Sequence, residues 1–154
     1  MFYYGGFSGL SGPWEYNNPN NTIVLRLIIH LLQRESTDEL LLDYLKVLSN
    51  DKRAEYLFHD ILTDDRNHYD ALKKSYVQIA RQVPKITPGE IEIPNNLDEG
   101  LFYIMSRKKG TIKLYSQLKN QINPMYINEI DSFIVDELTH MHFINYLLNR
   151  ESIS

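Results

Sequence analysis

Four stretches of the chain repeat apolar residues at steps of three and four, and ionisable residues interrupt each stretch near its middle. Such steps place side chains on one face of an α-helix. Breaking and capping residues bound the stretches, which predict helices at about 23–48, 52–82, 97–121 and 126–149. Asn21 or Thr22 is expected to cap the first helix, and Asn96, with Glu99 three residues later, the third. Four helices with one apolar stripe each are typical of an all-α bundle.

The connections predict how these helices are arranged. The first and last are short, so the helices that they join should be antiparallel neighbours. The middle connection spans roughly fifteen residues, contains several prolines, and is long enough to cross the length of the bundle. The prediction is two antiparallel helical hairpins joined by one long crossover. We expect a Tyr-, Gly- and Asn-rich tail at 1–21, the bundle at 22–149, and a polar tail at 150–154 that frays.

Composition narrows the chemistry that such a bundle can perform. The 154 residues carry 16 Lys and Arg against 20 Asp and Glu, and this acidic excess argues against a nucleic-acid partner. No apolar run is long enough to span a membrane. The first residues lack the pattern of a secretory signal, so we expect a cytoplasmic protein. The chain has no Cys, so any metal ion would have to be held by His, Asp and Glu.

The interrupting residues follow a shared pattern. The second and fourth stretches each carry an acid three residues before a histidine, Asp65 with His68 and Glu137 with His140. This spacing puts both side chains on one helix face. One such pair is often an ordinary surface or core pair, but two copies on apolar stripes, with Glu35 at matching depth, favour a single buried layer. Carboxylates in such a layer need positive charge, and iron, manganese or zinc bound by carboxylate and imidazole is one way to supply it.

The remaining histidines do not share this layer. His30, His59 and His142 fall off the apolar stripes, and His142 lies about 200° around the helix from His140. We therefore expect these three side chains at the surface.

The pattern resembles the ferritin-like superfamily and, within it, the rubrerythrin-like di-iron carboxylate proteins. The resemblance covers about 22–149 and rests on three segments: Gln33-Arg34-Glu35, Asp64-Asp65-Arg66-Asn67-His68 and Asp136-Glu137-Leu138-Thr139-His140. It implies a ferritin-like four-helix bundle, with Glu35 as the terminal carboxylate of a first metal ion and His68 beside it. By the same resemblance, Asp65 and Glu137 are bridging carboxylates, and His140 is a ligand of a second ion.

The chain departs from the family pattern at two positions. Asp65 stands where the family has Glu, and its shorter side chain has less reach for bridging. Lys108 stands where the third helix of the family has Glu, in a register supported by Tyr115 seven residues later. A protonated lysine cannot ligate a metal ion and repels a nearby cation. We therefore expect Lys108 to replace the second metal ion and to pair with Glu137 or Asp65.

Two hypotheses follow. In the first, one ion of iron or manganese is bound by Glu35, Asp65, His68 and Glu137, and the protein has a redox role linked to oxygen or peroxide. In the second, no metal is bound, and Lys108 belongs to a buried ion network in a non-catalytic structural or binding protein. The residues leave open whether the protein is an enzyme, and none is assigned as catalytic. The resemblance further implies a homodimer and, because Cys is absent, a separate protein as electron donor.

Overall fold

The computed structural model describes residues 19–153, so almost all of the tail expected at 1–21 lies outside the described residues. Within them the elements are α2 (Pro19–Leu48), α3 (Lys52–Ala80), α4 (Leu97–Gln121), the short 3-10 helix η1 (Pro124–Tyr126) and α5 (Ile127–Ile153). No strand occurs in this range. The expected all-α four-helix bundle is therefore confirmed.

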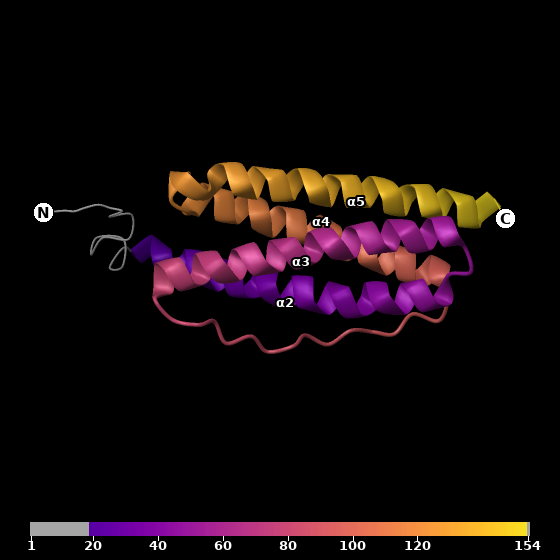
Figure 1. Ribbon diagram of the computed structural model, residues 1–154, viewed down its shortest axis with the longest axis horizontal. Helices are drawn as coiled ribbons and strands as arrows, with labels where there is room; N and C mark the ends of the chain where they lie inside the picture. Colours follow the sequence, from indigo (N-terminus) through magenta and orange to yellow (C-terminus); the bar gives the residue numbers. More distant parts are fainter. Residues whose placement is uncertain (1–18, 154) are drawn as a thin grey trace, which may run out of the picture.

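The helices are arranged as two antiparallel hairpins. Figure 1 shows α2 beside α3 and α4 beside α5, with the segment 81–96 running along the outside of the bundle from one end to the other. This segment contains no helix or strand and joins α3 to α4, which point in the same direction. The predicted long crossover is confirmed.

The helix ends agree with the sequence prediction in part. Asn96 caps α4 by accepting from the Glu99 backbone N–H at 2.9 Å. The expected cap at Asn21 or Thr22 is wrong, because α2 begins at Pro19 and both residues lie inside it. Proline suits the first turn of a helix, where its missing N–H would have no intrahelical partner.

The last helix also extends further than the predicted end at about residue 149. α5 continues to Ile153, so most of the segment 150–154, which is expected as a tail, lies within the helix. Arg150 in its last turn forms an ion pair with Asp51, the residue that caps the start of α3. This contact fixes the end of α5 to the neighbouring hairpin, which is a tertiary effect that local sequence does not indicate.

The core consists of two apolar clusters with a polar layer between them. One cluster contains Ile28, Leu31 and Leu32 of α2, and the other contains Leu41, Leu42 and Leu45 further along the same helix. Within the described range, the buried acids, bases and histidines are Glu35, Asp38, Asp65, His68, Lys108, Glu137 and His140. Among the described residues, no helix has the length and apolar character needed to cross a membrane.

Candidate metal centre

The structure brings together all the site residues that the sequence predicts. Every helix contributes from its middle: Glu35 from α2, Asp65 and His68 from α3, Lys108 from α4, and Glu137 and His140 from α5, each at most 2% exposed. By contrast, His30, His59 and His142 are exposed, as expected. Because apolar residues lie on both sides, the buried charges of the layer need counter-charges close by.

Lys108 supplies one positive charge. Its Nζ donates to both carboxylate oxygens of Asp65 at 2.7 Å and to Oε1 of Glu137 at 3.2 Å. Burial alone would lower the pKa of Lys108, but the charges of Asp65 and Glu137 raise it well above its usual value. The side chain is therefore an ammonium ion, and it pairs with both of the carboxylates that the sequence offered as alternatives.

His68 supplies a second positive charge. Its Nδ1 lies 3.1 Å from Oε2 of Glu35 and 3.4 Å from Oε1 of Glu137. Its Nε2 lies 2.8 Å from Oδ2 of Asp136. Burial alone would lower the pKa of His68, but hydrogen bonds to Glu137 and to its other two carboxylate neighbours raise it to about 11. At neutral pH both ring nitrogens of His68 therefore carry protons.

His140 has the opposite character. Its Nε2 lies 2.8 Å from Oδ2 of Asp64, whereas its Nδ1 has no hydrogen-bond partner and lies 3.6 Å from Oδ1 of Asp65. Burial and the charge of Lys108 lower the pKa of His140, so the ring is neutral at pH 7. A neutral ring that donates its Nε2–H to Asp64 keeps the lone pair on Nδ1, directed into the layer.

Each histidine is thus held by an aspartate from the other hairpin. Asp136 of α5 binds His68 of α3, and Asp64 of α3 binds His140 of α5. The sequence prediction gave neither aspartate a role. In both acid-x-x-His segments, however, an aspartate directly precedes the acid. A carboxylate on the outer ring nitrogen is how metal-binding histidines are commonly oriented, and here it turns Nδ1 of both rings toward the layer.

A further buried ion pair, also missed by sequence reasoning, lies next to this layer. Asp38 of α2 is fully buried and pairs with Nε of Arg107 on α4. Arg34 donates to the Arg107 carbonyl oxygen at 2.7 Å and to Oγ1 of Thr111 at 3.0 Å, on either side of Lys108 in the chain. The buried negative charge of Asp38 is therefore compensated by Arg107.

Four side chains could hold one metal ion. One ligand atom each from Glu35, Asp65, His68 and Glu137 lies within 4.8 Å of the other three, and all four residues are buried. Ligands about 2.1 Å from an ion lie up to about 4.2 Å apart, so small side-chain shifts suffice for all four to reach it. Oε1 of Glu35 is buried and has no hydrogen-bond partner, as expected of an oxygen available to a ligand. These residues fit a single divalent ion.

A second ion does not fit the same layer. The Lys108 ammonium lies between Asp65 and Glu137, the two carboxylates that would bridge a pair of ions, and within 3.2 Å of each. A second cation there would face this positive charge at close range in a site that excludes water. His140, whose expected role is ligand of the second ion, also lies outside the four-residue group.

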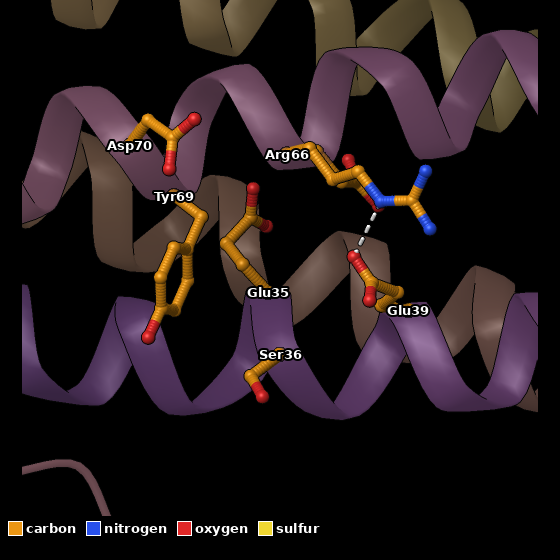
Figure 2. Close-up of a pocket in the computed structure, with 7 residues that line it drawn as sticks. Glu35, Ser36, Glu39, Arg66, Tyr69 and Asp70 are labelled. Carbon is orange, nitrogen blue, oxygen red and sulfur yellow. Dashed lines mark hydrogen bonds and ion pairs between the residues drawn. The ribbon is translucent and has the colours of Figure 1, made fainter.

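A surface cavity lies beside the layer. It has a volume of about 300 Å³ and lies between α2 and α3. Its lining residues are Glu35, Ser36, Glu39, Asp65, Arg66, Tyr69 and Asp70. In Figure 2, Glu35 rises from α2 between Tyr69 on one side and the Arg66–Glu39 ion pair on the other.

Comparison with known proteins supports the fold. No protein-family profile matches the sequence, and no curated protein matches it with significance. Among solved structures, a ferritin-like, diiron-carboxylate protein from Bacillus anthracis strain Ames superposes with a TM-score of 0.73. It is 19% identical, over 85% of this chain and 99% of that chain. The chain therefore has the ferritin-like fold that its sequence predicts.

Proposed function

We propose that this ferritin-like protein binds one divalent ion, iron or manganese, between Glu35, Asp65, His68 and Glu137. The observation that carries the proposal is that one ligand atom from each of these four buried side chains lies within 4.8 Å of the other three. In this proposal Lys108 holds Asp65 and Glu137 in place of a second ion. Each carboxylate oxygen that accepts from Lys108 retains a further lone pair for a metal ion.

Charge balance supports a single ion. For ligation, His68 gives up the proton on Nδ1 and keeps its bond to Asp136 through Nε2. With Glu35, Asp65 and Glu137 ionised, the three carboxylates face one ammonium ion, so the two positive charges of a divalent ion complete the balance. Glu35 also releases a proton, because burial and the charge of Glu137 raise its pKa to about 7.

A metal ion at this site would give the protein a redox role. Bound iron or manganese would supply one-electron chemistry with oxygen or peroxide. The chain would contribute a site that excludes bulk water, an oriented His68 ring and the fixed positive charge of Lys108. Electrons would come from a separate protein, since the chain has no Cys to hold an electron-transfer centre of its own. The expected homodimer stays a prediction.

Metal analysis tests the proposal directly. Protein purified without chelator and loaded with iron or manganese should contain about one ion per chain, because the ligand set is complete for one. Glu35→Gln, which removes the negative charge but keeps the shape, should lower this content sharply. A content below about 0.1 ion per chain in the unsubstituted protein, far from saturation of a built site, would contradict metal binding.

A second candidate function is a non-catalytic structural or binding protein without metal. It is favoured by the contacts of Lys108 and His68, which already give Asp65 and Glu137 two positive counter-charges. In this alternative the layer is an ion network that fixes how the hairpins dock. Metal content decides between the two candidates, because only the first requires an ion.

A further inference from the structure

Another cavity lies between α2, α4 and the segment 81–96 that crosses the outside of the bundle. It has a volume of about 150 Å³. Its lining includes Gln33, Arg34 and Thr37 of α2, Gly89 and Glu90 of the crossing segment, and Arg107 of α4. None of these residues is one of the four proposed metal ligands.

Arg34 in this lining is a half-buried cation without an acidic partner. Its Nε donates to Oγ1 of Thr111 at 3.0 Å and its Nη2 to the carbonyl oxygen of Arg107 at 2.7 Å, and both acceptors are uncharged. No carboxylate within residues 19–153 forms an ion pair with it. Burial and the charge of Arg107 lower the pKa of Arg34. A guanidinium group keeps its charge in a protein, so a negative counter-ion would stabilise it.

Arg107 is the second guanidinium group of the lining, and only part of it is engaged. Its Nε pairs with the buried Asp38, and its side chain is 15% exposed. In the part of the chain that the structure describes, its two terminal nitrogens have no hydrogen-bond partner. Both guanidinium groups are thus anchored through Nε and keep terminal N–H groups for a ligand. Such forks match the paired oxygens of a phosphate or carboxylate group.

The position of Arg34 depends on a glycine inside α4. A Cβ atom at Gly110 would lie 2.5 Å from Nη2 of Arg34, so a larger residue there would displace the guanidinium group. Glycine within a helix is less favourable than alanine. Gly110 therefore makes α4 less stable than alanine would, but it leaves the space in which Arg34 lies against the helix.

The crossing segment forms the outer side of the cavity. Nε2 of Gln33 donates to the carbonyl oxygen of Thr87 at 3.1 Å. A Cβ atom at Gly89 would lie 2.8 Å from Oγ1 of Thr37, so the backbone approaches α2 here more closely than a larger residue would allow. These contacts hold the segment against α2, and the cavity is therefore enclosed by elements that pack against one another.

We propose that this cavity binds a small oxyanion, a phosphate or carboxylate group, between Arg34 and Arg107. A volume of about 150 Å³ corresponds to roughly five water molecules at about 30 Å³ each, which accommodates one such group but not a nucleotide. The other titratable groups of the lining, His30 and Glu90, are exposed, and the charge of Glu90 opposes an anion. The proposal does not depend on a metal ion in the polar layer.

The test is a titration of isotope-labelled, chelator-treated protein with sodium phosphate and, separately, with sodium acetate. Backbone amide chemical shifts in nuclear magnetic resonance give the affinity and the place of binding, and the two anions show which group is preferred. At constant ionic strength, at least one anion should shift the amide of Gly89 with a dissociation constant of about 1 mM or below. Arg34→Gln should weaken binding about tenfold or more, and Glu90→Gln should strengthen it.

Two further variants separate the geometry of the cavity from net charge. Gly110→Ala changes no charge, but its Cβ would displace the Arg34 guanidinium group, so affinity should fall although alanine favours the helix. Arg26→Gln is the matched control, because Arg26 is an exposed arginine on α2 that does not line the cavity. Its affinity should stay within about twofold of the unsubstituted protein, since salt screens a distant charge. Melting temperatures check that each variant is folded.

Three results would overturn the proposal. The first is that neither anion binds to the unsubstituted protein at concentrations well above 1 mM, the affinity expected of about two charge-assisted contacts. The second is an equal loss of affinity in Arg34→Gln and Arg26→Gln, because binding would then follow net charge. The third is unchanged binding in both Arg34→Gln and Gly110→Ala, which would exclude Arg34 from the site.

Discussion

The ammonium group of Lys108 lies 2.7 Å from both carboxylate oxygens of Asp65, in a layer where neither side chain is more than 1% exposed. The same group reaches Glu137, so one side chain from α4 links α3 and α5 at the centre of the bundle. The buried charge of Lys108 therefore joins three helices. Its expected effects on the stability of the fold, on metal content and on the pH dependence of stability can each be measured.

Replacing Lys108 by Ala should destabilise the metal-free protein by about 3 kcal/mol or more, because Asp65 and Glu137 would remain buried without their partner. Urea unfolding of chelator-treated protein measures this. Lys109→Ala, at the exposed neighbouring position, should change the free energy of unfolding by less than about 0.5 kcal/mol. Equal stability of Lys108→Ala and the unsubstituted protein would contradict the ion network.

Lys108→Glu should raise metal content from one ion per chain toward two. The substitution removes the opposing charge and adds a carboxylate beside Asp65 and Glu137, and the lone pair of His140 on Nδ1 becomes useful for a second ion. Elemental analysis after iron loading measures the change, with the neutral Lys108→Gln as the control that removes only the charge. If Lys108→Glu still binds one ion, the short side chain of Asp65 is the next position to change.

The two aspartates that hold the histidine rings should differ in their effect on metal affinity. Asp136→Asn should weaken binding by about 10- to 100-fold, because Asp136 orients a proposed ligand, His68. Asp64→Asn is the matched control, because it orients His140, which lies outside the group of four ligands. Competition against a chelator of known affinity measures both. Equal losses in the two variants would mean that His140 also binds the ion.

Acid should remove the stabilising contribution of Glu137. Burial alone would raise the pKa of Glu137, but the charge of Lys108 and the hydrogen bond from His68 lower it to about 2. A carboxyl group whose folded-state pKa lies below its ordinary value of 4.5 stabilises the fold above that value and loses this contribution as pH falls toward 2.

The measurement is the difference in unfolding free energy between the metal-free protein and Glu137→Gln at a series of pH values. This difference should be constant near neutrality and shrink as the solution is acidified from about pH 4.5, the ordinary pKa of a glutamate. A difference that does not change with pH would show that the ionised carboxylate contributes nothing.

The sequence predicts the helices and the polar layer because both depend on spacing within single helices. Steps of three and four locate the stripes, and the depth of Glu35 and Lys108 along them places both in the layer with the two acid-x-x-His pairs. The charge of Lys108 identifies it as the residue that changes the site.

Contacts between helices are harder to predict from the sequence. Asp64 and Asp136 bind histidines on another helix. The spacing of residues along one helix does not reveal which neighbouring helix a side chain faces. The contact of Arg150, near the end of α5, with Asp51 joins residues that are distant in sequence. The cavity between α2 and α3 depends on the space left by packed side chains, for which sequence has no local signal.

The reciprocal aspartate–histidine bonds have a consequence for assembly. The hairpin of α2 and α3 contains Glu35, Asp65 and His68, but the carboxylate that aligns the His68 ring belongs to the other hairpin, which in turn depends on the first to align His140. Neither half can complete its own coordination geometry before the two halves have met. If the proposed site binds a metal ion, its capture is therefore conditional on correct docking, and a partly folded chain would have no preformed centre for the ion.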